Sequence, residues 1–496
     1  RPTIRLPQEL HLLATQAVDA LCSAPNLYQR AGRLVRVGVL GGRAPRWLRG
    51  ADAAPSVEPV EAGTLAVLLS EWATWTKRDG RSGKDKQTDP PDRLVKALLC
   101  ARPWPLPYLD GPIACPTLRP DGSLLVAPGY DPETGLYLSP TAPPADVPDR
   151  LVQSDAATAR AVLEDALCDF PFAAPHDRSA ALALLLTAVL RPAVVGPCPI
   201  FLVSGNAPGA GKSLLCDVAS VLATGQGAPR MAITREDEET RKRITAIAIA
   251  GLRFVLLDNV PAGGSLGSPS LDAALTAETW HDRRLGENQT VALPLRCLWM
   301  ATGNNVTVRG DLARRVVPVR LVASVEQPEE RTGFRHAPLL DWCRQERSGL
   351  VEAALVLARA YTLAGSPDVG LAPYGSYESW SAVVRSALVW SGAPDPCAGR
   401  ERLRDEADPD AQAMAGLLAA WHAAPLLSGW QPLRTIVACE ALKDALLDVA
   451  EKNGAPDGRT IAYRFRASVD RLFGGYVLRR KIEGHNRQAR WMVATT

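Results

Sequence analysis

One stretch of this chain restricts the fold more than any other, because it combines a strand, a glycine-rich turn and a helix in a fixed order. Residues 199–223 read PIFLVSGNAPGAGKSLLCDVASVLA. The apolar run 200–203 is typical of a buried strand, and the apolar spacing after Lys212 and Ser213 predicts a helix. A strand that leads through such a turn into a helix is the context that a phosphate-binding loop requires. We therefore expect an α/β core built around this segment.

The turn supplies the groups that a nucleoside triphosphate needs. Gly209 and Gly211 let backbone N–H groups wrap a phosphate, while Lys212 can reach the terminal phosphates. Ser213 can ligate Mg²⁺ at the start of the helix. Asn206 departs from the usual pattern, which has glycine at that position. ATP and Mg²⁺ are the expected cofactors, and the expected binding residues are Asn206, Ala207, Pro208, Gly209, Ala210, Gly211, Lys212, Ser213 and Leu214.

A second apolar run, residues 252–260 (LRFVLLDNV), ends in Asp258. A buried strand that ends in aspartate is common, but after a phosphate-binding loop it indicates a carboxylate that holds Mg²⁺ through water. Many ATPases of this kind have a glutamate next, whereas Asn259 stands here and cannot accept a proton. The alternative candidates for the catalytic base are Glu238, Glu239 and Glu278, each of which could equally be a solvated helix charge.

A third apolar run, within residues 295–305 (LRCLWMATGNN), ends in polar residues. Asn304 could orient the γ-phosphate and the attacking water if this strand lies beside the other two. A Gly-Asn-Asn sequence is also an ordinary turn. We favour a phosphate sensor at Asn304.

Two adjacent arginines, Arg314 and Arg315, follow in the segment GDLARR. A guanidinium at this place could reach the γ-phosphate of a neighbouring subunit and stabilise charge in the transition state. The alternative is a basic pair on the surface.

The length of 496 residues exceeds what one hydrophobic core supports, so several domains are expected. The apolar share of 47% and the charged share of 22% fit a soluble globular protein. The patterns predict an N-terminal α+β accessory domain, a candidate for DNA binding, over residues 1–140, and an α/β domain over 151–330. A helical lid or bundle is expected over 331–425, and a basic winged-helix-like domain over 426–496.

The last segment carries a local excess of positive charge. Residues 457–496 hold nine basic and three acidic side chains, whereas the whole chain has a net charge of only +3. Phosphate binding by this segment is expected, although its aromatic residues are better explained as a small core. The expected DNA-binding residues here are Arg464, Arg466, Arg479, Arg480 and Lys481.

The ten cysteines lie far apart without a C-x-x-C pair, which favours buried, reduced thiols. The N-terminal sequence RPTIRLPQEL lacks the apolar core of a signal peptide, and no apolar run is long enough to cross a membrane. A cytoplasmic location is expected. The chain starts at Arg1 instead of methionine, which suggests a piece of a longer polypeptide and leaves an upstream domain open.

With NAPGAGKS, VLLDN, ATGNN and GDLARR in this order, residues 150–330 resemble superfamily 3 and related self-loading AAA+ helicases. The resemblance is to the helicase modules of phage, plasmid and genomic-island primase–helicase proteins. It implies an AAA+ core, a hexameric ring with an arginine finger supplied in trans, and ATP-driven movement along single-stranded DNA during replication in a bacterial or phage-infected cell. It also implies forked DNA as a substrate and a primase as a partner.

In such motors a hairpin before the sensor strand projects into the ring channel. Residues 281–295 (HDRRLGENQTVALPL) have the corresponding place. Arg283 and Arg284 flank the expected turn at residues 286–288 and could contact DNA phosphates, or the hairpin could be only structural.

Three other functions stay open from the sequence. They are an AAA+ protein remodeller, an origin-binding initiator in which ATP acts as an assembly switch, and a small-molecule P-loop kinase. A kinase needs neither the sensor asparagine nor the arginine pair, and a remodeller more often carries an aromatic pore loop than a basic hairpin.

Overall fold

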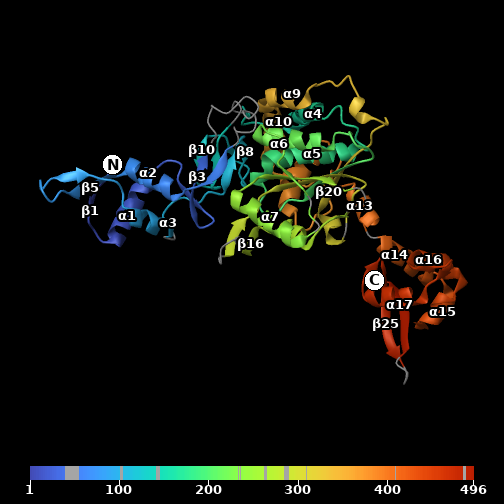
Figure 1. The fold of residues 1–496 in the computed structure, drawn as a ribbon. Coiled ribbons are helices and arrows are strands. Elements are labelled where there is room, and N and C mark those ends of the chain that lie inside the picture. The colour runs from blue at the N-terminus through green and yellow to red at the C-terminus, as the bar shows by residue number, and fades with distance from the viewer. Residues whose placement is uncertain are drawn as a thin grey trace. The chain divides into compact units, whose positions relative to one another are not determined.

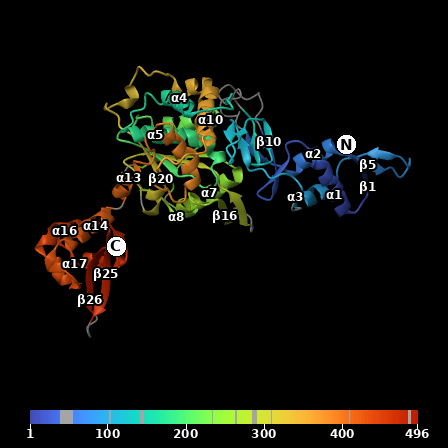
Figure 2. The ribbon, with the colours of Figure 1, turned by 180° about the vertical axis from the view of Figure 1, so that it is seen from behind.

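The computed structural model describes residues 1–38, 55–100, 104–140, 146–232, 234, 236–261, 265–283, 290–308, 310–407, 409–483 and 488–495. Contacts divide the chain into two compact units. The main unit comprises Arg1–Thr307 and Arg314–Arg400, and the C-terminal unit comprises Val308–Ala313 and Glu401–Thr496. Figures 1 and 2 show the elements of each unit from two sides.

A five-stranded parallel sheet lies at the centre of the main unit. Its strands, in spatial order, are β13 (Arg230–Met231), β14 (Phe254–Val260), β18 (Leu298–Asn304), β12 (Ile200–Gly205) and β20 (Val316–Leu321). The strands that precede the three motifs are thus neighbours, with β18 between the other two. Because all five run in the same direction, their carboxyl ends share one edge, which is where open α/β sheets bind ligands. The expected α/β core is confirmed, and its central sheet is parallel.

Both faces of this sheet are buried, as its continuous apolar strands require. Phe201 and Val203 belong to the main hydrophobic cluster, while Ile200 and Leu202, which alternate with them along β12, point to the opposite face and are also buried. Figure 1 shows α5 and α6 on one side of β20 and α7 on the other. The helices that surround the sheet include α4 (Gln153–Asp165), α5 (Pro175–Leu190), α6 (Lys212–Thr224), α7 (Asp237–Ala250) and α10 (Arg347–Leu363).

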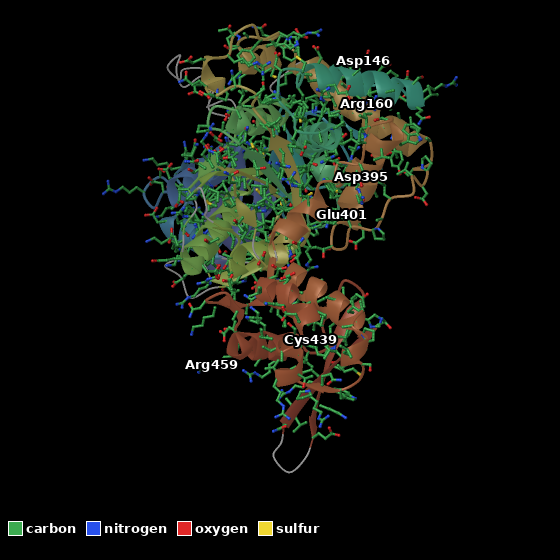
Figure 3. All side chains as sticks on the ribbon, turned by 90° about the vertical axis from the view of Figure 1, so that its right-hand side faces the viewer. Asp146, Arg160, Asp395, Glu401, Cys439 and Arg459 are labelled. Carbon is green, nitrogen blue, oxygen red and sulfur yellow. The ribbon has the colours of Figure 1, made fainter. Side chains whose placement is uncertain are left out.

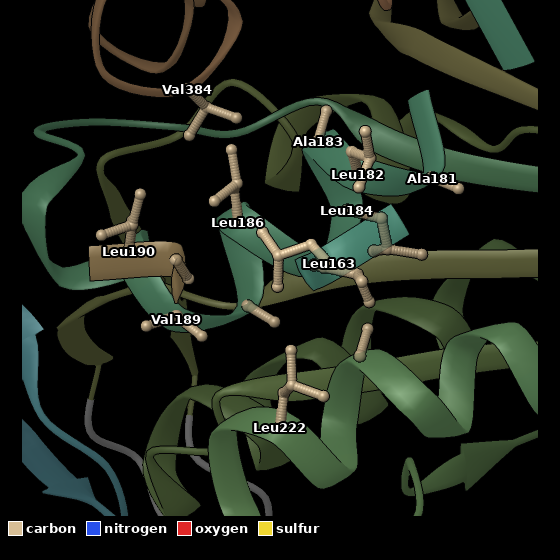
Figure 4. Close-up of a cluster of buried hydrophobic side chains, with 14 of the residues drawn as sticks. Leu163, Ala181, Leu182, Ala183, Leu184, Leu186, Val189, Leu190, Leu222 and Val384 are labelled. Carbon is tan, nitrogen blue, oxygen red and sulfur yellow. The ribbon is translucent and has the colours of Figure 1, made fainter. Parts of the chain in front are cut away.

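The main cluster joins helices that are far apart in the sequence. Leu163 of α4, Leu186 of α5 and Leu222 of α6 lie in it together with Val384, and all four are fully buried (Figure 4). Helix α10 packs against α4 and ends at Leu363, where Gly365 has a φ of 81°. Glycine is common just after the end of a helix, because it adopts the left-handed conformation without strain. Further short helices of this region are α8 (Pro269–Ala274), α9 (Leu339–Gln345), α11 (Glu378–Trp380) and α12 (Ser386–Trp390).

An antiparallel hairpin lies between β14 and β18 in the sequence, where one was expected. It is formed by β16 (Thr279–Arg283) and β17 (Thr290–Pro294), with Arg283 opposite Thr290. Residues 284–289 are outside the described residues, and the predicted turn and Arg284 fall there.

The N-terminal part of the main unit mixes helices with small sheets. Its helices are α1 (Leu10–Leu21), α2 (Ala62–Trp72) and α3 (Asp92–Cys100). Its three-stranded sheets are β1 (Thr3–Leu6), β5 (Thr74–Arg78) and β6 (Asp85–Gln87); β2 (Tyr28–Arg30), β3 (Arg33–Gly38) and β4 (Ser56–Pro59); and β10 (Gly129–Asp131), β11 (Leu136–Leu138) and β7 (Gly111–Ile113). Buried Arg30 donates to the Ala248 carbonyl of α7 at 2.9 Å, and Arg253 pairs with Asp110 at 2.9 Å. These two contacts tie the N-terminal part to the α/β core.

The C-terminal unit consists of helices followed by a long hairpin. Its helices include α14 (Pro409–His422), α15 (Leu433–Val437), α16 (Lys443–Val449) and α17 (Gly458–Ala467). Its antiparallel sheet has the order β21 (Gln431–Pro432), β26 (Gln488–Thr495), β25 (Tyr476–Glu483) and β24 (Leu472–Phe473). Phe465 packs edge-on against Trp491, with ring centroids 5.2 Å apart, and stacks on Trp421 of α14. The aromatics Phe465 and Trp491 are therefore core residues, and α14 belongs to this core instead of to the helices around the sheet.

All ten cysteines are free thiols, as expected, but not all are buried. Cys22, Cys100 and Cys168 are exposed, and each lies close to the end of a helix. None of the helices in the described parts combines the length and hydropathy that a bilayer crossing requires.

Candidate functional site

The glycine-rich turn connects β12, which ends at Gly205, to α6, which begins at Lys212. Gly209 and Gly211 have φ values of 73° and 90°, a left-handed region that suits glycine. A Cβ atom on Gly209 would lie 2.5 Å from a carboxylate oxygen of Glu329, and one on Gly211 would lie 3.1 Å from the Phe170 ring. The left-handed backbone therefore favours glycine at both positions, and a side chain would also be crowded there.

Lys212 and Asn206 hold the two ends of this loop. The Nζ of Lys212 donates to the Ala207 carbonyl at 2.8 Å, so the side chain folds back over the loop. Partial burial lowers the pKa of the Lys212 ammonium. The Asn206 side chain donates to the Ala323 carbonyl at 3.1 Å and accepts from the Ala323 N–H at 2.9 Å. This pair of bonds fastens the loop to the segment after β20, which gives Asn206 a role that glycine could not fill.

Hydrogen bonds join the tips of α6, β14 and β18. Ser213 Oγ donates to Asp258 Oδ1 at 2.8 Å, and Thr302 Oγ1 donates to the same oxygen at 2.6 Å. The backbone N–H of Asn259 donates to Thr302 Oγ1 at 2.9 Å. Burial raises the pKa of the Asp258 carboxyl, but the hydrogen bonds from Thr302, Ser213 and Arg230 outweigh it, so the net shift is downward. Asp258 is thus held as a carboxylate beside Ser213.

Asn304 ends β18 directly opposite Gly205, the last residue of β12. Its side-chain Oδ1 is buried and accepts no hydrogen bond from the described residues. The turn begins only after it, where Asn305 has a φ of 48°. A buried acceptor without a donor is costly unless a ligand or water supplies one.

Thr302 and Arg230 both contact Asp258, although neither was predicted as a site residue from the sequence. Arg230 Nε donates to Asp258 Oδ2 at 2.9 Å, and its Nη2 donates to Asp217 Oδ2 at 2.8 Å. Strand β13 contains only two residues, which is too short to produce a periodic signal in the sequence.

A cavity of about 460 Å³ adjoins the glycine-rich turn. Its lining is largely apolar and includes Phe170, Gly209, Gly211, Leu214, Phe334 and His336. The His336 ring stacks on Trp342, with centroids 3.8 Å apart, and its Nε2 lies 2.8 Å from Asp165 Oδ2. The position of His336 in the cavity wall is therefore fixed by tertiary contacts.

The three candidate glutamates are not equivalent in position. Glu238 and Glu239 lie in the first turn of α7 and form ion pairs of 3.1 Å with Lys242 and Arg243. A carboxylate oxygen of Glu278 lies 3.4 Å from the point that a Cβ atom on Gly196 would occupy. Gly196 precedes β12, so Glu278 lies at the end of the sheet opposite the loop. Its place argues against Glu278 as a base at this site.

The two adjacent arginines also differ. The Arg315 side chain is only 10% exposed, and its Nη1 donates to the backbone carbonyl of Asp272 and lies 3.4 Å from the Asp272 carboxylate. The Arg314 side chain is exposed, while its backbone carbonyl accepts from Arg400 at 2.8 Å. Of the pair, Arg314 is the one that is presented to solvent.

The predicted DNA-binding residues of the C-terminal unit mostly have partners within the chain. Arg464 pairs with Asp410 at 2.7 Å, Arg479 with Asp470 at 2.5 Å, and Lys481 with Glu483 at 3.3 Å. Arg480 lies over the Trp491 ring, 5.6 Å from its centroid.

Arg466 belongs to a different surface, on α17. Ile461 and Phe465 form the buried side of this helix, and Arg459, Tyr463 and Arg466 lie on its exposed side. Tyr463 is 68% exposed. Figure 3 shows Arg459 at the surface of the C-terminal unit. We call Arg459, Tyr463 and Arg466 the α17 face.

Comparisons with known proteins give little further information. No protein-family model and no curated protein matches the sequence. Among solved structures, the C-terminal region of NrS-1 in an apo form is similar at 10% sequence identity and a TM-score of 0.44, over 89% of this chain and 94% of that chain. JCV helicase is similar at 15% identity and a TM-score of 0.21, over 48% of this chain and 67% of that chain. At these identities and TM-scores the likenesses carry no conclusion about function.

Proposed function

We propose that the chain is an ATP hydrolase of helicase type, an AAA+ motor that moves along single-stranded DNA as a ring during replication of a mobile genetic element. The observation that carries this proposal is the meeting of Lys212, Ser213, Asp258 and Asn304 at one edge of the parallel sheet. These residues come from three elements, and this set of side chains is what binding and hydrolysis of a triphosphate require.

The residues present fit ATP and Mg²⁺. Gly209 and Gly211 have φ values of 73° and 90°, the left-handed backbone shape that lets successive N–H groups converge on a phosphate, which supports a role for the turn as a backbone cradle. Lys212 would bind the terminal phosphates, and Ser213 with Asp258 would hold the metal ion. The largely apolar cavity beside the turn has a volume suited to a nucleobase and its ribose.

Bound Mg²⁺ would neutralise charge that develops on the phosphates. The buried Oδ1 of Asn304 would accept a hydrogen bond from the attacking water and so orient it. Asn259 cannot accept a proton, so catalysis at this site would depend mainly on positioning and on charge stabilisation, which are the main contributions in phosphoryl transfer.

Residues outside the triphosphate site would serve the ring and the DNA. Arg314 is the better candidate for an arginine finger, because it is exposed whereas Arg315 is buried. Arg283 at the end of β16, with Arg284, would contact DNA from the hairpin. The C-terminal unit, with its helices and basic hairpin, would act as a winged-helix DNA-binding domain.

An assay of ATP hydrolysis with and without single-stranded DNA tests the proposal. Lys212→Ala is expected to abolish hydrolysis and strand unwinding while DNA binding by the C-terminal unit stays nearly intact. Lys242→Ala, which removes an exposed lysine paired with Glu238, is the control and should behave as the wild type. Hydrolysis that is unchanged in Lys212→Ala would refute the assignment. ATP hydrolysis that is stimulated by unfolded protein instead of by DNA would favour a protein remodeller.

A further inference from the structure

Arg230 occupies a place in the site that none of the three sequence motifs includes. It begins β13 at the edge of the sheet, where it pairs with Leu256 of β14. From there its guanidinium reaches two carboxylates on different elements, Asp217 of α6 and Asp258 of β14. It thus links the helix that follows the phosphate loop to the strand that carries the metal-binding aspartate.

Asp217, the partner of Arg230 on α6, is held in a fixed position. Asp217 is 7% exposed, and its Oδ1 accepts the Ala228 backbone N–H at 2.9 Å while its Oδ2 accepts from Arg230 at 2.8 Å. The guanidinium is planar, so fixing one of its donors on Asp217 restricts where the other can lie. The Nε of Arg230 therefore has a defined position when it meets Asp258.

The two oxygens of Asp258 have separate partners. Oδ1 accepts from Ser213 and Thr302, whereas Oδ2 accepts from Arg230 at 2.9 Å. The metal ion of the proposed function would lie on the Ser213 side, and so beside Oδ1. We infer that Arg230 is a positioning residue that holds Oδ2 of Asp258, so that Oδ1 stays turned toward the magnesium site; this inference rests on the proposed function.

An alternative role for Arg230 is a positive charge that competes with the metal ion. Two observations oppose it. The guanidinium bonds the oxygen that faces away from Ser213, and its side chain is 50% exposed, so water screens its charge. Groups that orient a metal ligand commonly change metal affinity by about 10- to 100-fold when they are replaced.

The test measures binding of a fluorescent, non-hydrolysable ATP analogue to the full chain in Mg²⁺ and in EDTA. The ratio of the two affinities reports the metal site, while the affinity in EDTA reports the phosphate loop.

Arg230→Lys keeps the charge but cannot bridge both carboxylates with the same geometry. Asp217→Asn removes the acceptor for Arg230, because the amide oxygen would still accept the Ala228 N–H and the amide NH₂ would then face the Arg230 N–H group. Arg36→Lys is the matched control, since Arg36 is also half-exposed and bonds one carboxylate, that of Glu58.

Both site variants are expected to bind the analogue in EDTA as the wild type does. The gain that Mg²⁺ provides, which is the ratio of the affinity in Mg²⁺ to the affinity in EDTA, should be about tenfold smaller in the variants than in the wild type. The control should keep the full gain. An unchanged or larger Mg²⁺ gain in Arg230→Lys would overturn the inference. Weak binding in EDTA by both variants would also overturn it, because Arg230 would then support the whole loop. Absence of binding by the wild-type chain in either condition would instead refute the proposed function.

Discussion

At the scale of single residues, the site depends on backbone shape as much as on side-chain chemistry. Gly211 has a left-handed φ of 90° directly before Lys212, and it lies against the Phe170 ring. Any side chain at this position must disturb either the loop or the ring. The orientation of Lys212 depends on the loop that Gly211 closes.

Gly211→Ala is therefore expected to destabilise the chain by about 1–2 kcal/mol, because alanine disfavours a left-handed φ, and to weaken ATP binding. Chemical denaturation and nucleotide titration measure these two effects. Gly375→Ala is the control, since Gly375 has ordinary φ and no neighbouring atom within 4 Å of the added Cβ. Equal effects of the two substitutions would contradict this account of Gly211.

The individual site residues differed in how far they could be predicted. Lys212, Ser213 and Asp258 could be identified because each follows or ends a strand with a strong local pattern. Arg230 and Asp217 could not, because their roles arise only when β13 and α6 come together. Asn206 seemed a departure from the motif, and its two bonds to Ala323 explain why asparagine stands there.

At the scale of elements, α17 presents a surface distinct from that of the neighbouring hairpin. Arg459, Tyr463 and Arg466 share its exposed side, whereas several basic residues predicted to bind DNA are paired with acidic side chains. Exposed surface ion pairs contribute little to stability, but a partnered cation is less available to a phosphate. Helical spacing, more than the number of charges, therefore decides which side chains DNA would meet.

We expect Arg466→Ala to weaken DNA binding more than Arg479→Ala, which serves as the paired control. Loss of a phosphate contact should also reduce the dependence of affinity on salt concentration. Fluorescence anisotropy with labelled single-stranded and forked DNA at several salt concentrations measures both quantities. A larger loss in Arg479→Ala would show that the hairpin, and not the α17 face, meets the DNA.

The elements themselves were more predictable than their partners. The β12–turn–α6 unit and the strands β14 and β18 follow from local patterns, whereas the β16–β17 hairpin was expected only from the resemblance to helicase motors. The order of the strands in the sheet does not, because it depends on contacts between distant segments. For the same reason, the packing of α14 against the C-terminal hairpin could not be read from its helical pattern.

At the scale of the whole molecule, the chain forms two compact units, and only the main unit contains the proposed triphosphate site. A ring would complete that site with Arg314 from a neighbouring chain. The contact of Arg315 with Asp272 instead belongs to the interior of the main unit. Replacing Arg314 should therefore affect ATP hydrolysis, whereas replacing Arg315 should affect stability.

Arg314→Ala should leave folding intact and reduce ATP hydrolysis by about 10³-fold or more, as loss of an arginine finger does. Arg315→Ala should lower thermal stability, since it removes a buried guanidinium that bonds the backbone and faces the carboxylate of Asp272. Mixing Lys212→Ala and Arg314→Ala chains should restore part of the activity, because some interfaces then combine both native residues. No recovery on mixing would count against a shared site.

The most direct measurement is calorimetric titration of ATP into the chain in the presence of Mg²⁺. We expect one binding event per chain, which Lys212→Ala weakens by at least tenfold, or about 1.4 kcal/mol. Absence of binding heat, or equal affinity in Lys212→Ala, would contradict the claim that the carboxyl edge of the parallel sheet is a triphosphate site.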